Sequence, residues 1–154
     1  MANTQAMCTS FKPELLNAIH QFGSPTITSR TSLTTPTADT FKAALYFATA
    51  TVDSTTTVYS STGEATGTGY TAGGVTFTWI APTSSGTTGY STPSASFAWT
   101  TATIAAFDAV FLYNSTQGNK AVSVHTFGSQ TVTAANFTLT MPSNAAGTAL
   151  IRLA

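Results

Sequence analysis

Charged residues are scarce in this sequence: of its 154 residues, five are Lys or Arg and five are Asp or Glu, so the formal net charge is zero. Nucleic-acid binding calls for a basic stripe, and binding to an anionic membrane surface calls for clustered Lys or Arg. We therefore expect neither nucleic acid nor a membrane as a partner. A chain near zero net charge lacks the self-repulsion that keeps many proteins apart, which favours ordered assembly as a homo-oligomer.

Cysteine and long apolar runs are also scarce. Cys8 is single, so it has no internal disulfide partner, and we interpret it as a small buried or tolerated thiol. No apolar run approaches the roughly 18 residues of a membrane-spanning helix, and no charged-then-apolar secretory leader is visible. From these features we expect a chain that folds in a cytoplasm.

Hydroxyl residues take the place of the missing charge: 34 residues are Thr and 16 are Ser. Apolar residues make up 42% of the chain, which is enough for a packed core, so disorder is not expected. A chain of this length can bury one sizeable core. The composition predicts a globular fold with a hydroxyl-rich, nearly uncharged surface.

The segment "SFKPELLNAIHQFG", residues 10–23, has helical periodicity. Pro13 and Glu14 suit a first helical turn, and Gly23 can end the helix. The apolar stripe comprises Phe11, Leu15, Leu16, Ile19 and Phe22. So short a helix is marginal alone, so its stripe needs a partner, and these five residues are our candidate protein interface. The alternative is that the helix caps an open end of its own domain.

Residues 24–38, "SPTITSRTSLTTPTA", contain two prolines and many hydroxyl residues without clear periodicity, which is typical of an extended arm. We therefore divide the chain into an N-terminal helix and arm, residues 1–38, and a β domain, residues 39–154.

After residue 38 the sequence is strand-like throughout. Short segments rich in β-branched and aromatic residues are separated by Gly, Pro, Asn and Ser, as in an all-β sandwich or jelly roll. They are "FKAALYFATAT", "GVTFTWI", "SASFAWTTATI", "FDAVFLYN", "KAVSVHTFG", "QTVTA", "NFTLTM" and "ALIRL". In the last of these, Leu150, Ile151 and Leu153 are expected to be buried and Arg152 to point outward.

The glycine-rich stretch "TGEATGTGYTAGGVTFTW", residues 62–79, poses the clearest question about chemistry. Gly67, Gly69 and Ala72 match the dinucleotide-binding pattern G-x-G-x-x-G/A. That motif requires a helix after the glycines, whereas these run into a period-two strand. We expect Gly73 and Gly74 to form a hairpin turn, where a Cβ costs roughly 1 kcal/mol, and we expect no nucleotide to bind.

Other catalytic patterns are weak. His20 and His125 with Cys8 are too few and scattered for a zinc site. We interpret His20 as structural or exposed and place His125 on the strand face opposite Val122 and Val124. The carboxylates Glu14, Asp39, Asp53, Glu64 and Asp108 show no calcium-loop spacing, although two could still converge in space as in a glycosidase. We predict no enzyme, no metal site and no cofactor.

Several segments resemble small structural proteins of tailed bacteriophages. They are "DTFKAALYFATAT", "TTVYSSTGEATGTGYTAGG", "FDAVFLYNSTQGNKAVSVHTFGSQTVTAANFTLTMP" and "ALIRLA", and the likeness covers about residues 11–153. The resemblance implies a virion component, made in the host cytoplasm: a capsid decoration or cement protein, or an accessory piece of the neck, tail or fibres. Its partners would be other virion proteins, and it transfers no catalytic residues.

Two other classes remain as alternatives. A receptor- or carbohydrate-binding adhesin on a phage tail or fibre would use aromatic residues near turns, and Tyr70, Tyr90 and Trp99 are the candidates. A bacterial surface or pilus subunit is disfavoured by the missing leader.

Overall fold

The computed structural model describes residues 3–16, 19–23 and 37–153, and in them the chain is all-β with antiparallel sheets. The larger sheet has the order β1-β8-β7-β2-β4, with β3 added to β7. Its strands are β1 (Ala6–Met7), β2 (Phe41–Phe47), β3 (Gly67–Thr68), β4 (Val75–Phe77), β7 (Phe97–Asn114) and β8 (Lys120–Leu139). A smaller sheet has the order β5-β6-β9, formed by Thr83–Ser85, Thr88–Ser91 and Ile151–Leu153.

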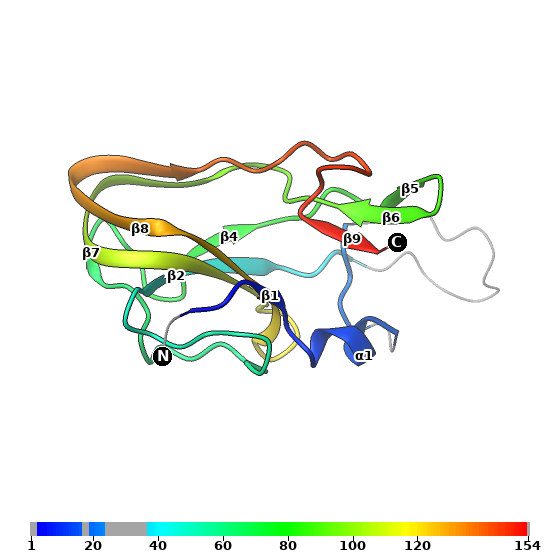
Figure 1. The fold of residues 1–154 in the computed structure, drawn as a ribbon, viewed down its shortest axis with the longest axis horizontal. Coiled ribbons are helices and arrows are strands. Elements are labelled where there is room, and N and C mark those ends of the chain that lie inside the picture. Colours follow the sequence, from blue (N-terminus) through cyan, green and yellow to red (C-terminus); the bar gives the residue numbers. More distant parts are fainter. Residues whose placement is uncertain (1–2, 17–18, 24–36, 154) are drawn as a thin grey trace.

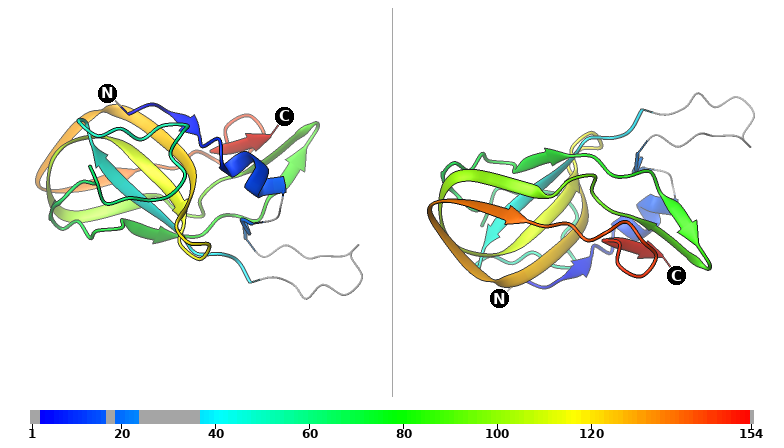
Figure 2. Two further views of the ribbon diagram at one scale, coloured as in Figure 1. Left: turned by 90° about the horizontal axis from the view of Figure 1, so that it is seen from below. Right: turned by 90° about the horizontal axis from the view of Figure 1, so that it is seen from above.

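The β7–β8 hairpin organises the molecule. β7 has 18 residues and β8 has 20, and the hairpin folds over so that its two halves lie on opposite sides of the core (Figures 1 and 2). The prediction of five short strands in this region is wrong. The chain bends at bulges without leaving the strands, and Thr101 and Ala134 adopt positive φ there.

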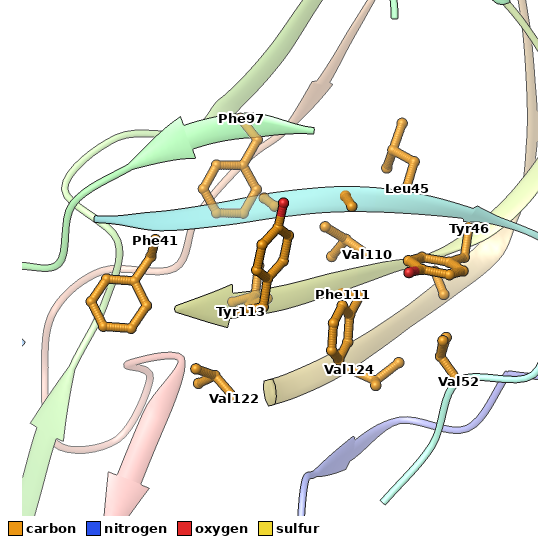
Figure 3. Packing of buried hydrophobic residues seen from close by; sticks show 14 of the residues in the cluster. Phe41, Leu45, Tyr46, Val52, Phe97, Val110, Phe111, Tyr113, Val122 and Val124 are labelled. Carbon is orange, nitrogen blue, oxygen red and sulfur yellow. The ribbon is translucent and has the colours of Figure 1, made fainter. Parts of the chain in front are cut away.

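β2 lies in the middle of this arrangement and is buried on both faces. Leu45 and Val110 are cross-strand partners whose side chains point to the same side as Phe97 (Figure 3). Tyr46, Phe111 and Val124 point to the other side, toward Val52 (Figure 3). A strand covered on both faces loses the clean alternation of a half-exposed strand, which explains the continuous apolar run "AALYF".

The N-terminal helix is much shorter than expected. α1 spans Phe11–Leu16, and Ile19–Gly23 is not helical, so the amphipathic helix predicted from Phe11 to Phe22 is not supported. The non-helical backbone lets the His20 and Phe22 side chains enter the core. The Phe22 ring lies 5.8 Å from the Phe11 ring and 4.8 Å from the Trp79 ring. Apolar spacing alone did not distinguish a long helix from a short helix followed by a buried loop.

Residues 3–23, where described, pack on the same core as the rest of the chain. β1 pairs with β8, and Cys8, Phe11 and Phe22 belong to the main cluster of buried residues. The predicted arm, residues 24–38, falls outside the described residues except for its last two positions.

The predicted strand at the C-terminus is confirmed as β9. Ile151 is buried and Arg152 is exposed, as expected. Leu153 is 49% exposed, which contradicts the expectation that it would be buried. It lies at the rim of an apolar groove described below.

Candidate functional site

The glycine-rich stretch packs against the protein's own backbone. A Cβ on Gly67 would lie 1.9 Å from the carbonyl oxygen of Thr103, and one on Gly74 would lie 1.9 Å from that of Ala43. Gly73 and Gly74 both have positive φ, as predicted, at 86° and 76°. The turn does not form a hairpin, however, because β3 pairs with β7 and β4 pairs with β2. Gly67 and Gly74 allow the backbone of this stretch to lie directly against the backbone of β7 and β2.

Glu64, the only carboxylate of the stretch, holds the loop in place from inside. Its side chain is buried, and its Oε1 accepts hydrogen bonds from the Tyr70 hydroxyl and the Gly73 amide, both at 2.7 Å. Its Oε2 accepts a bond of 2.5 Å from the Tyr59 hydroxyl. The Tyr113 hydroxyl donates to the Gly73 carbonyl oxygen at 2.8 Å. We name Glu64, Tyr59, Tyr70, Gly73 and Tyr113 the glutamate cluster.

The tyrosines of the glutamate cluster remain protonated over a wide pH range. Burial raises the pKa of Tyr113 to about 12, with the negative charge of Glu64 adding to the effect. The pKa values of Tyr59 and Tyr70 are also raised by burial and by the bonds that they donate to Glu64. Phenols that stay protonated act here as hydrogen-bond donors, which suits a structural role.

A second polar cluster joins the N-terminal residues to the end of the β7–β8 hairpin. His20 is 6% exposed; its Nε2 lies 2.9 Å from Glu14 Oε2 and its Nδ1 lies 3.2 Å from Asn114 Nδ2. Asn114 Nδ2 also donates to Asp39 Oδ2 at 2.7 Å. Lys120 Nζ donates to Glu14 Oε1 at 2.5 Å. We name Glu14, His20, Asp39, Asn114 and Lys120 the histidine cluster.

The histidine cluster brings together two of the five carboxylates considered in the sequence. Glu14 and Asp39 flank His20 and Asn114, so the space between them is filled by these side chains. Glu64 belongs to the glutamate cluster, Asp53 accepts bonds from Thr55 in an exposed turn, and Asp108 accepts a bond from Asn3. The interpretation of His20 as structural agrees with its burial. The roles of Glu64, Asp39 and Asn114 were missed, and the only sequence signal for Glu64 was a lone carboxylate among glycines and tyrosines.

The five residues of the predicted interface do not form one exposed stripe. Phe11 is fully buried and Phe22 is 6% exposed, both in the core. Leu15 and Ile19 are partly exposed, and the Leu16 side chain lies outside the described ones. In this packing, a partner can contact Leu15 and Ile19 but not the buried Phe11 and Phe22.

An apolar groove separates α1 from the smaller sheet. It encloses about 140 Å³, and Phe11, Leu15, Phe22, Tyr90, Ile151 and Leu153 contribute to its walls. Figure 2 shows α1 and the smaller sheet side by side at this end of the molecule. Leu15 on one wall and Leu153 on the other are accessible apolar side chains, and Pro82 in the lining is also exposed.

The aromatic residues considered for a sugar-binding site are dispersed. Trp99 is buried and stacks on Tyr70, whose hydroxyl belongs to the glutamate cluster. Tyr90 is separate from these two residues and lines the apolar groove. Tyr70 and Trp99 therefore contribute to packing and hydrogen bonding in the interior.

His125 lies on the strand face opposite Val122 and Val124, as predicted, but that face is covered. It lines a cavity of about 150 Å³ with Phe97, Leu139 and Met141, and its Nε2 lies 2.9 Å from Ser123 Oγ. Burial lowers the pKa of His125 from 6.5 to about 4. The neutral ring is the form that fits this cavity.

We expect His125 to make the fold sensitive to acid. Its pKa is lower in the folded than in the unfolded chain, so its contribution is complete above about pH 6.5 and is lost as the pH falls toward 4. His125→Gln should reduce the loss of unfolding free energy between about pH 7 and 4 by about 3 kcal/mol. Urea unfolding at several pH values measures this. Parallel pH profiles for the two proteins would contradict it.

Within residues 3–16, 19–23 and 37–153, no group of three His, Cys, Asp or Glu side chains is placed to hold a metal ion. The same residues contain no helix long and apolar enough to cross a membrane. Comparisons of the chain with protein-family models, with curated proteins and with solved structures found no match.

Proposed function

We propose that the protein is a non-enzymatic structural component of a tailed-phage virion: a capsid decoration or cement protein, or a neck or tail accessory protein. The resemblance of the sequence to small virion proteins suggests this role, and the all-β fold is compatible with it. In this proposal the folded-over sheet is a sandwich-like domain, and its partners are other virion proteins and further copies of the chain.

The observation that carries the proposal is the apolar groove on an otherwise hydroxyl-rich, sparsely charged chain. Leu15 and Leu153 offer apolar contact area without competing charges, which suits permanent contact with a neighbouring protein. The titratable side chains of the two polar clusters bind one another and the backbone. Their arrangement supports a scaffold rather than a reactive centre. No specific contact favours the adhesin alternative, because Tyr70 and Trp99 point inward.

Substitution at the groove tests this proposal. Leu15→Asp places a charge where a neighbouring protein would have to bury it, so attachment to particles lacking the protein should fall at least tenfold. Thr131→Asp adds the same charge at an exposed position of β8 and should attach normally. The measurement is co-sedimentation of purified chain with such particles. Circular dichroism and melting confirm that both variants are folded.

Equal attachment of both variants would remove the groove from the interface. Failure of the wild-type chain to attach to any particle would contradict the virion role itself.

A further inference from the structure

The hydrogen bonds of Asn114 determine which nitrogen of His20 carries the proton. Asn114 Oδ1 accepts from the backbone amides of Thr116 and Gln117 at 3.1 and 3.2 Å, so the other end of the amide is the nitrogen. That nitrogen faces His20 Nδ1 and can only donate. His20 Nδ1 is therefore unprotonated, and the ring proton on Nε2 is donated to Glu14.

Asn114 cannot reorient to accept a proton from His20. Turning its amide would place Nδ2 against the amide hydrogens of Thr116 and Gln117. It would also place an oxygen against Asp39 Oδ2, which now accepts from Asn114 at 2.7 Å and from the Gln21 amide at 3.0 Å. A second proton on His20 therefore puts a donor against a donor in a buried site, which costs the hydrogen bond and the desolvation of both groups.

We propose that the histidine cluster is a proton-sensitive latch that holds α1 and residues 19–23 on the core, and that protonation of His20 Nδ1 releases this segment. We name α1 and residues 19–23 the latch segment. Three side-chain hydrogen bonds of the latch link it to the rest of the chain: Lys120 to Glu14, Asn114 to His20, and Asp39 to the Gln21 amide. The Asp39 amide also donates to the Gln21 carbonyl oxygen at 3.2 Å, and Phe11 and Phe22 pack in the core. The inference does not depend on the proposed virion role.

The charges around His20 act in opposite directions. Glu14 and Asp39 favour the protonated ring, whereas Lys120 disfavours it, and these are the charged groups that face His20 among the described side chains. Burial outweighs them and lowers the pKa of His20 below its ordinary value of 6.5. The docked segment thus binds the proton less tightly than the released one. Docking is complete above about pH 6.5 and weakens as the pH falls.

Release would uncover an apolar surface. The Phe11 ring lies 4.8 Å from the His20 ring, which in turn stacks on Phe41. The Phe22 ring packs directly on Trp79 and on Phe41, 5.2 Å from the latter. Phe11 and Phe22 also line the apolar groove. Protonation would therefore enlarge the groove, while β1 keeps its own pairing with β8.

Hydrogen exchange read by mass spectrometry on the full chain tests the latch. Between about pH 7.5 and 5.5, after correction for intrinsic rates, amides of the latch segment should exchange several-fold faster, up to about tenfold, which is the limit for uptake of one proton by a released histidine. Amides of the β7–β8 hairpin should keep their protection. His20→Gln, which cannot take up the proton, should show the same latch-segment exchange at both pH values. His125→Gln, which removes the other histidine, should behave as the wild type.

If His20→Gln does not fold, measurements on the wild-type chain alone still test the latch. The His20 ring should titrate by NMR with the same midpoint as the exchange of the latch segment. Constant protection of that segment, loss of protection in step with the hairpin, or a midpoint that differs from the His20 titration would overturn the latch. The same acid response in a folded His20→Gln chain would also overturn it.

Discussion

Gly74→Ala is expected to destabilise the fold by more than about 4 kcal/mol, enough to leave little folded protein at 37 °C. The added Cβ would lie 1.9 Å from the Ala43 carbonyl oxygen and 2.7 Å from Ala44 Cα, both backbone atoms of β2. β2 is covered on both faces, so it cannot move away without disturbing the core. The positive φ of Gly74 adds roughly 1 kcal/mol. Urea unfolding followed by circular dichroism measures the loss.

Gly86→Ala is the matched control for this substitution. Gly86 also has positive φ, 57°, but a Cβ there would meet no atom within 4 Å. Its cost should be about 1 kcal/mol, from backbone strain alone. Equal losses at Gly74 and Gly86 would show that close approach to β2 contributes nothing.

Glu64→Ala is expected to lower the unfolding free energy by about 4 kcal/mol, because it leaves one buried and two half-buried donors without an acceptor. These are the hydroxyls of Tyr59 and Tyr70 and the amide of Gly73. Glu64→Gln keeps one carbonyl oxygen for Tyr70 and Gly73 and should cost about half as much. Thermal and urea unfolding at neutral pH measure both losses.

Asp53→Ala is the control for Glu64, because Asp53 is a carboxylate that binds Thr55 in an exposed turn. Its loss should change stability by about 0.5 kcal/mol or less. If Glu64→Ala were as mild as Asp53→Ala, the glutamate cluster would not hold the loop.

The sequence predicted strand structure well because period-two patterning is a local signal. It did not predict the bend of the β7–β8 hairpin, because Thr101 and Ala134 rarely take the positive φ found there. Long-range bonds support both positions: Asn136 Oδ1 accepts from the Thr101 amide, and Thr103 Oγ1 accepts from the Ala134 amide, each at 3.0 Å. The sequence around Thr101 or Ala134 alone does not indicate these distant hydrogen-bond partners.

The two polar clusters show the same limit. Glu14 and Lys120 are 106 residues apart, and His20 and Asn114 are 94 apart, so their contacts depend on the fold. The apolar spacing of residues 11–22 correctly indicated that Phe11 and Phe22 are buried, but it did not require a continuous helix between them. The positive φ of Gly73 and Gly74 was predicted correctly, whereas the predicted hairpin was wrong and the close approach to β2 was not foreseen.

Quantitative peptide mass spectrometry of purified phage particles tests the virion role most directly. We expect this chain to be present in a fixed ratio to the major structural proteins. It should also remain bound after a wash at high salt, because contacts through an apolar, uncharged groove are weakly screened. Absence of the chain from washed particles, or trace amounts that vary between preparations, would contradict the account.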